Sequence, residues 1–326
     1  MLGGTAWLGH EVARAALDRG HEVTCLARGV SGTVPEGARW VRADRDGDRA
    51  YDAVRGTDWD DVVDVSWQPR QVRSAVAALA NRAGHWTYVS SCSVYVDHYL
   101  RGQAENAPTF EPLEADTADQ ENYGPAKVAC ERIVLDRLGS RALLARAGLI
   151  GGPGDASDRF GYWVGRFALA GDGPVLVPEA TGHETQTIDV RDLAEWMISA
   201  GEHCYHGPVN AVGERCHLGD VLAAAREVAG HTGKVVVADA RWLTKRGVTG
   251  WAGPRSLPLW LPEPEYAGFG ARDDARALRF GLKRRPLRDT LVDVLDDERQ
   301  RGLDRDRRAG LRRSDELELL AELGVG

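Results

Sequence analysis

The five-residue stretch YGPAK holds two side chains that together can move a proton. Tyr123 and Lys127 stand four residues apart, so on a helix they share one face. An ammonium group near a phenol favours the phenolate, and such a tyrosine can exchange a proton with a substrate oxygen near neutral pH. Upstream, YVSSCSVY ends a predicted strand with Ser90, Ser91 and Ser93. A hydroxyl at that strand end can hydrogen-bond the same oxygen, so the two stretches predict chemistry at a carbonyl or hydroxyl group.

The first nine residues, MLGGTAWLG, predict a turn that approaches a bound anion. Gly3, Gly4 and Gly9 let the backbone come close to a diphosphate, and the helix that follows presents free N–H groups. A plain strand-to-helix turn without a ligand is the alternative. Only Met1 and Leu2 precede the first glycine, whereas a strand normally has about five residues. We expect that the first strand is trimmed, with reduced stability and cofactor affinity; a very short strand that suffices is the alternative.

Alternating strands and helices must position these residues. The predicted strands are 22–27, 38–44, 60–66, 86–91 and 142–150, and the predicted helices are 7–19, 70–84 and 125–138. This alternation predicts an α/β fold with a doubly wound parallel sheet, the Rossmann fold, with an unusually short first strand. We expect residues 1–150 to form a nucleotide-binding domain to which the chain returns around residues 183–212. Residues 151–326 predict a second, smaller α/β domain for the substrate.

Composition disfavours several classes of function. Of the 326 residues, 43% are apolar and 28% charged, as expected of a folded globular protein. The formal net charge of −8 disfavours a nucleic-acid partner, and no apolar run or signal sequence predicts a membrane partner. Five scattered cysteines without a CxxC pair argue against disulfides and a metal site, and the histidines lack metal-ligand spacing. We therefore expect a cytoplasmic monomer or homodimer that acts on a small molecule.

The motifs follow one another in the order of a known enzyme family. The chain carries the loop Gly3-x-x-Ala6-x-x-Gly9, then VSSCSVY, YGPAK, RAGLIGGPGD and TQTIDVRDLAEW. In this it resembles the extended short-chain dehydrogenases/reductases, the NAD-dependent epimerase/dehydratase family. Ala6 departs from the middle glycine of the family's loop and predicts a slightly tighter pocket. The resemblance implies hydride transfer between nicotinamide and a substrate carbon that bears a hydroxyl or carbonyl group.

The resemblance also implies roles for the site residues. Tyr123 would be the acid/base, and Lys127 would bind the nicotinamide ribose and favour the phenolate. Ser91 would orient the substrate oxygen, with Ser93 as the second choice and a substrate contact. The expected cofactor contacts are Gly3, Thr5, Ala6, Trp7, Leu8, Gly9, Arg28, Asp44, Ser66, Tyr123 and Lys127.

Arg28 favours NADP(H) as the cofactor. An acidic residue at the end of the second strand would bind a ribose 2′-hydroxyl, but here Ala27 is followed by Arg28. A guanidinium group suits a 2′-phosphate instead. NAD(H), with Arg28 merely exposed, is the alternative. Asp44 matches the family's adenine-contacting aspartate, and a helix or turn cap is its alternative role.

The residues after the strand-end serine limit which reactions of the family are expected here. Dehydratases of the family carry an Asp-Glu pair there, because elimination of water needs an extra acid and base, whereas this chain has Cys92 and Ser93. Glu111 and Glu114 could supply another proton-transfer group, and solvated loop residues are the alternative. We expect an NADP(H)-dependent reductase or dehydrogenase. An NAD(P)-dependent epimerase of a sugar or sugar nucleotide and a non-catalytic NADP(H)-binding sensor or scaffold remain alternatives.

The second domain offers three candidate substrate contacts. Arg159, Tyr162 and Trp163 occur together in SDRFGYWVGR. Ordinary helix packing is the alternative for the tyrosine and the tryptophan. Near the end of the chain, residues 296–313 mix basic and acidic residues and predict a solvated helical face.

Overall fold

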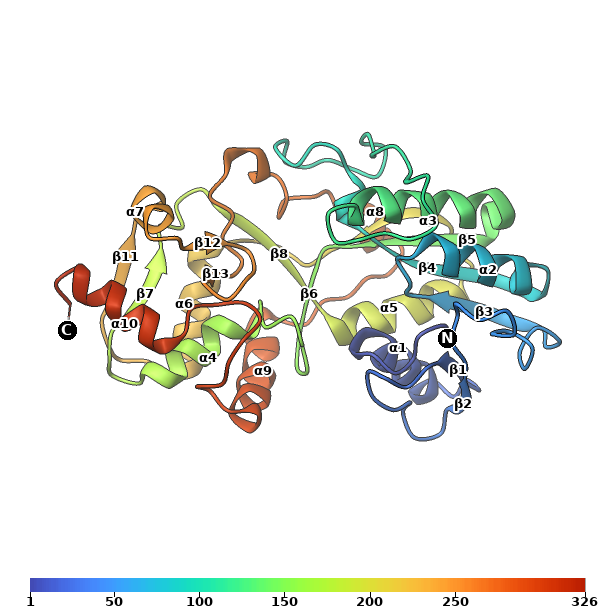
Figure 1. Cartoon of the computed structure of the whole chain (residues 1–326), viewed down its shortest axis with the longest axis horizontal. Helices are drawn as coiled ribbons and strands as arrows, with labels where there is room; N and C mark the ends of the chain where they lie inside the picture. Colours follow the sequence, from blue (N-terminus) through green and yellow to red (C-terminus); the bar gives the residue numbers. More distant parts are fainter. Residues whose placement is uncertain (326) are drawn as a thin grey trace.

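The computed structural model describes residues 1–325, which form two lobes (Figure 1). In the first lobe, parallel strands lie in the order β2, β1, β3, β4, β5, β9, with Leu2 between β1 and β3. The strands are β1 (Thr24–Ala27), β2 (Arg39–Arg42), β3 (Trp59–Asp64), β4 (Ala83–Ser91), β5 (Ala142–Ala147) and β9 (Gly207–Ala211). This order confirms the predicted doubly wound α/β fold.

A single residue, Leu2, completes this sheet at its centre. It makes parallel bridges to Leu26 of β1 and to Asp64 of β3. The Leu2 N–H donates to Val63 O at 2.8 Å, and the Gly3 N–H donates to Leu26 O at 3.0 Å. The leucine side chain is 3% exposed and belongs to the core. The glycine-rich loop therefore begins directly at the carboxyl edge of the sheet.

Helices cover both faces of the sheet because their apolar sides face it. Helices α1 (Trp7–Asp18) and α5 (Val190–Glu202) pack together on one face, with a core that includes Val12, Val89 and Met197. Helices α2 (Pro69–Leu79) and α3 (Tyr123–Leu138) pack on the other face, around residues such as Trp86 and Tyr88. Asp189 caps α5 by accepting from the Arg191 N–H at 2.9 Å. Short 3₁₀ turns join several elements: η1 (Ala80–Arg82), η2 (Cys92–Val94), η3 (Gly139–Arg141) and η4 (Pro264–Tyr266).

A three-stranded sheet includes β6 and β8, which lie between the two lobes (Figure 1). Strand β8 (Glu184–Asp189) pairs with β6 (Leu149–Gly151) and β10 (Arg215–His217). The single strand predicted over residues 142–150 is therefore wrong: it divides at Gly148 into β5 and β6, which belong to different sheets. Any side chain at position 148 would crowd Val212, because a Cβ there would lie 3.0 Å from a Val212 methyl group. The change from β5 to β6 therefore occurs at a glycine.

The second lobe has its own core. Large side chains including Trp163, Phe167 and Trp260 pack within it. Its elements are α4 (Gly161–Ala170), β7 (Val175–Pro178), α6 (Leu218–Ala229), β11 (Val235–Ala238), α7 (Ala240–Lys245), β12 (Thr249–Gly250), β13 (Ser256–Leu257), α9 (Leu287–Arg301) and α10 (Arg313–Glu322), while α8 (Ala275–Arg279) packs against β9 of the first lobe. Within residues 1–325, no helix is long and apolar enough to cross a membrane.

A buried ion pair fixes α3, which carries Tyr123 and Lys127, to strand β5. The Arg146 guanidinium donates to both Glu131 oxygens, at 2.9 and 2.7 Å, and the Ser90 hydroxyl donates to the same carboxylate at 2.5 Å. The Arg146 and Glu131 side chains are 6% and 5% exposed. Because neither charge can be hydrated, each depends on the other.

We predict that Arg146→Met destabilises the protein by about 3–5 kcal/mol, because it leaves the Glu131 carboxylate buried without its cation. Urea unfolding measures this change. Adding Glu131→Gln to Arg146→Met should recover part of the loss. The control is Arg132→Ala, which removes an exposed ion pair to Glu111 at 3.6 Å and should change stability little. Equal losses in the buried and the exposed variant would contradict the assigned role of the Glu131–Arg146 pair.

Candidate functional site

The glycine-rich loop leaves the first turn of α1 open to an anion. Ala6 precedes the helix with φ −92° and ψ 159°, a conformation open to any residue, and no side chain caps the helix. The first N–H groups of α1 therefore have no intrahelical acceptor, as a diphosphate site requires. Gly3 has φ +107°, and a Cβ there would lie 2.7 Å from a Val65 methyl group. Glycine is thus required at position 3, whereas alanine at position 6 strains nothing.

The side chains of the same loop serve packing. The Thr5 side chain is buried, and Leu8 packs against the core under α1 and α5. The backbone of Gly9 is buried as well. The Trp7 indole N–H donates to Pro153 O at 2.7 Å, and a Cβ at Gly154 would lie 3.2 Å from the indole ring. Trp7 therefore joins the predicted cofactor loop to the loop that follows β6.

Arg28 and Asp44 lie together beyond the carboxyl ends of β1 and β2. Arg28 Nη1 is 4.0 Å from Asp44 Oδ2, and both side chains are more than half exposed. Asp44 Oδ1 also accepts from the Asp46 N–H at 3.1 Å, which is a turn-stabilising contact. A Cβ at Gly32 would lie 2.8 Å from Thr5 O, so the loop after Arg28 passes over the glycine-rich loop.

Lys127 is buried against backbone carbonyl groups. Its ammonium donates to Val89 O at 2.6 Å and to Ser66 O at 3.2 Å, and it lies 4.9 Å from the Tyr88 ring centroid. Ser66 O also accepts from the Tyr88 hydroxyl at 2.9 Å. An ammonium has three donors, so one remains for a ligand. Among residues 1–325, no carboxylate lies within ion-pair distance of Lys127.

Tyr123 begins α3 with its ring beside Lys127 and Trp67. The Lys127 Nζ is 5.9 Å from the Tyr123 ring centroid, and the Trp67 ring centroid is 5.5 Å from it. Gln68 fixes the loop that carries Trp67, because its amide donates to Ala118 O at 3.0 Å and accepts from the Ala118 N–H at 2.9 Å. Sequence reasoning missed Trp67, although it directly follows Ser66 at the end of a strand.

Ser91 and Ser93 lie on the turn against which α3 begins. Ser91 Oγ accepts from the Ser93 N–H and donates to Ser93 Oγ, both at 3.1 Å. A Cβ at Gly124 would lie 2.5 Å from Ser93 O, so the first turn of α3 touches the serine turn. The structure thus brings Ser91, Ser93, Tyr123 and Lys127 to one edge of the sheet, and both serines are partly accessible.

Cys92 cannot act as the missing acid or base. Burial raises the pKa of the Cys92 thiol to about 12, and the thiol donates to Arg146 O at 3.3 Å. Glu111 and Glu114 are exposed. Within residues 1–325, no group of three or more histidine, cysteine or acidic side chains could hold a metal ion.

The three candidate substrate contacts of the second lobe separate in the structure. Tyr162 and Trp163 are 0% and 1% exposed, because α4 turns both into the second core, where neither presents a surface to a substrate. Arg159 precedes α4 and is half-buried; its Nε donates to Ser157 Oγ at 3.2 Å. Burial lowers the pKa of Arg159, and the negative charge of Asp155 opposes this.

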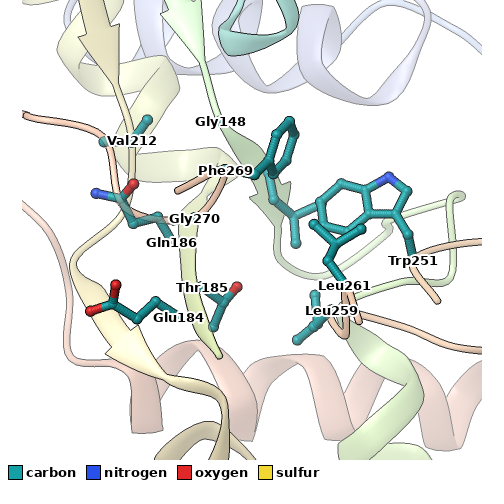
Figure 2. Close-up of a pocket in the computed structure, with 11 residues that line it drawn as sticks. Gly148, Glu184, Thr185, Gln186, Val212, Trp251, Leu259, Leu261, Phe269 and Gly270 are labelled. Carbon is teal, nitrogen blue, oxygen red and sulfur yellow. The ribbon is translucent and has the colours of Figure 1, made fainter. Parts of the chain in front are cut away.

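A small space, with room for about one water molecule, lies between β6, β8 and the irregular segment around residues 251–270 (Figure 2). The Trp251 indole, Phe269, Leu259 and Leu261 gather on one side of it (Figure 2). The Arg159 guanidinium lies 4.8 Å from the Trp251 ring centroid. The walls of this space come from parts of the chain far apart in sequence.

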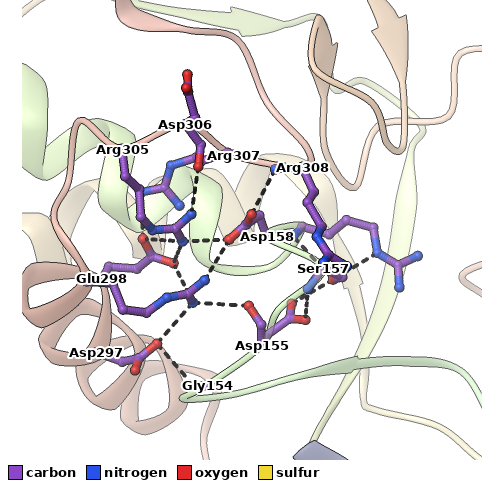
Figure 3. Close-up of polar contacts among 12 residues, drawn as sticks. Gly154, Asp155, Ser157, Asp158, Asp297, Glu298, Arg305, Asp306, Arg307 and Arg308 are labelled. Carbon is purple, nitrogen blue, oxygen red and sulfur yellow. Dashed lines mark hydrogen bonds and ion pairs between the residues drawn. The ribbon is translucent and has the colours of Figure 1, made fainter. Parts of the chain in front are cut away.

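Ion pairs hold the loop after β6 against α9 and the loop that follows it (Figure 3). Asp158 Oδ1 accepts from Arg301 at 2.9 Å and from Arg305 at 2.5 Å, and Glu298 lies 2.6 Å from Arg307. Asp297 accepts from the Gly154 N–H at 3.0 Å. The solvated helical face predicted for residues 296–313 therefore holds only in part: α9 ends at Arg301 and Glu298 is buried in its ion pairs, whereas residues such as Asp296, Arg299 and Arg312 are exposed.

Comparisons with known proteins match this geometry to one family. The model of the "NAD dependent epimerase/dehydratase family" matches residues 1–213. Among curated proteins, no sequence matches the chain significantly.

Solved structures share the fold across nearly the whole chain. UDP-glucuronic acid 4-epimerase from Bacillus cereus in complex with NAD is similar at 15% identity and a TM-score of 0.65, over 92% of this chain and 97% of that one. The UDP-Glc/GlcNAc 4-epimerase from Campylobacter jejuni is similar at 13% identity and a TM-score of 0.67, over 92% of this chain and 98% of that one. The Thermus thermophilus UDP-glucose 4-epimerase in complex with NAD is similar at 19% identity and a TM-score of 0.59, over 91% of this chain and 97% of that one.

We predict that Cys92 resists iodoacetamide at pH 8 while Cys204 is alkylated. Burial raises the pKa of Cys92 to about 12, so its thiol stays protonated and enclosed, whereas Cys204 is exposed. Peptide mass spectrometry after a timed reaction measures the labelling of each cysteine. In urea, where both are exposed, the two should react alike. Rapid labelling of native Cys92 would contradict its placement inside the core.

Proposed function

We propose a reaction for this chain, which belongs to the NAD dependent epimerase/dehydratase family of enzymes: reversible hydride transfer between a nicotinamide cofactor and a hydroxyl or carbonyl carbon of a small metabolite. The observation that carries the proposal is the buried ammonium of Lys127, which keeps one free donor beside the Tyr123 ring. In a plain structural role, this lysine would be expected to pair with a carboxylate.

Each residue has one role in the proposed reaction. During reduction, the Tyr123 hydroxyl gives its proton to the carbonyl oxygen of the substrate. The positive charge of Lys127 stabilises the phenolate that remains. To donate to the same substrate oxygen, the Ser91 hydroxyl turns its single O–H away from Ser93 Oγ, and the Ser93 hydroxyl can then donate to Ser91 Oγ and orient it. When bound, nicotinamide supplies the hydride for reduction and accepts it during oxidation.

The cofactor proposed for this site is NADP(H), with NAD(H) as the alternative. The uncapped first turn of α1 suits the diphosphate, and the third donor of Lys127 suits a ribose hydroxyl. Arg28 favours a 2′-phosphate because its guanidinium is exposed and only loosely paired, 4.0 Å from Asp44. The family description and the NAD complexes among the similar structures favour NAD(H).

A second candidate function is epimerisation of a sugar or sugar nucleotide. The similar structures named above are UDP-sugar 4-epimerases, and this favours the same hydride transfer followed by its return to the other face of the substrate. Dehydration is disfavoured because Cys92, in place of the family's acid, stays a buried thiol.

We predict that Tyr123→Phe lowers turnover by about 100-fold or more, because the substrate oxygen loses its proton donor. Cofactor binding, measured by calorimetry with NADPH, should stay within about twofold of the wild type. Turnover is followed by NADPH absorbance over a panel of carbonyl compounds. Wild-type turnover in this variant would overturn the proposed function.

We predict that Arg28→Ala weakens NADPH about 10- to 100-fold, because one charged hydrogen-bonding group is lost. NADH affinity should change little. Arg39→Ala is the matched control: it removes the same charge from the opposite end of β2, where the Arg39 Nε donates to Thr24 Oγ1 at 3.2 Å. Equal losses for both cofactors would remove the argument for NADP(H) and leave the hydride-transfer proposal intact.

A further inference from the structure

The phenol of Tyr123 has few contacts that fix its position. Among residues 1–325, its hydroxyl has no hydrogen-bond partner, and its ring belongs to none of the hydrophobic cores. The side chain is only partly buried. Two side-chain torsions carry the hydroxyl, so the contacts of the ring decide where it lies.

The indole of Trp67 supplies the aromatic contact to this ring. The two ring centroids are 5.5 Å apart and the ring planes are inclined by 57°, a separation at which aromatic pairs attract each other. Within the described part of the chain, Tyr123 makes no other ring-to-ring contact. Trp67 is also absent from the hydrophobic cores, so its indole packs on Tyr123 without being part of either lobe's interior.

Hydrogen bonds on both sides fix the backbone of Trp67. On one side, Ser66 O accepts from Lys127 Nζ at 3.2 Å, and Ser66 Oγ accepts from the Gln68 N–H at 3.2 Å. On the other side, the Gln68 amide makes its two hydrogen bonds with Ala118, in the loop that leads into α3. The turn that carries the indole is therefore attached both to the end of β3 and to the segment before α3.

We infer that Trp67 is a positioning residue for proton transfer and holds the Tyr123 phenol beside Lys127. The same turn then positions both members of the pair, because Ser66 O binds the ammonium and the next residue packs on the phenol. This inference rests on the proposed function for the reaction itself. Trp67 acts through Tyr123, and a misplacement of about 1 Å can lower a rate about 100-fold. Loss of the indole should therefore appear in turnover and not in cofactor affinity.

Fluorine NMR of the full chain labelled with 3-fluorotyrosine tests the position of the phenol without turnover. The Tyr123 resonance is identified by its absence in Tyr123→Phe. We expect Trp67→Ala to shift and broaden this resonance, because the ring current of the indole is lost and the phenol samples several orientations. Trp67→Phe keeps an aromatic ring and should leave the resonance narrow. An unchanged resonance in Trp67→Ala would overturn the inference.

Steady-state kinetics test the consequence for the reaction, with NADPH and the carbonyl compound that the wild type reduces fastest. We expect Trp67→Ala to lower kcat about 10- to 100-fold. Its NADPH affinity, measured by calorimetry, should stay close to that of the wild type, and Trp67→Phe should recover most of the turnover. An unchanged kcat in Trp67→Ala, or a loss of NADPH affinity as large as the loss of kcat, would also overturn the inference.

The matched control is Trp59→Ala at the opposite end of β3, where the indole N–H donates to Val54 O at 3.2 Å. Thermal unfolding should show a loss of stability in this variant, while its kcat and its Tyr123 resonance should not change. Equal losses of kcat in Trp59→Ala and Trp67→Ala would assign both effects to stability and contradict a positioning role. Failure of the proposed function would be seen separately, as turnover that persists in Tyr123→Phe while Trp67→Ala still shifts the Tyr123 resonance.

Discussion

A lysine ammonium buried without a carboxylate partner holds the candidate site together. Lys127 is 3% exposed, and its charge is satisfied by Val89 O, near the end of β4, and by Ser66 O, just beyond the end of β3. A buried charge is tolerated only where such partners are fixed in place. The lysine therefore ties the start of α3 to two strand ends and to the Ser66–Trp67 turn. Because those partners are neutral, the positive charge remains available to the two phenol rings beside it, Tyr88 at 4.9 Å, whose hydroxyl already donates to Ser66 O, and Tyr123 at 5.9 Å.

One short loop carries several of the contacts that connect the two lobes. Gly154 and Asp158, which follow β6, are held by Asp297 and by the arginines of α9 and the loop after it (Figure 3). The neighbouring Pro153 carbonyl accepts from Trp7 in the glycine-rich loop. Burial opposes ionisation of Asp158, but its bonds to Arg305 and to the Arg308 N–H keep its pKa below the ordinary value. The charge network is therefore complete at neutral pH, and it positions Arg159, next along the chain.

Sequence spacing predicted the contacts between residues of the same helix or strand. Contacts between distant parts of the chain could not be predicted in this way. Tyr123 and Lys127 are neighbours because α3 includes both, and Ser91 ends β4. Trp67 reaches Tyr123 across more than fifty residues of sequence, so no helical or strand periodicity could reveal that contact. Tyr162 and Trp163 were candidates because of their types, but the rotation of α4 directs them into the core. The ion pairs of Arg301 and Arg305 with Asp158 depend on where residue 158 lies, which a charge pattern does not contain.

The least regular part of the chain is held in one conformation, for a physical reason. Trp251 and Leu259 hold positive φ, at a cost that a flexible loop would relieve by relaxing. Here Leu257 and Trp260, both 0% exposed, anchor the same segment in the second core. Burial of these side chains offsets the strain and keeps the segment around residues 251–260 in place.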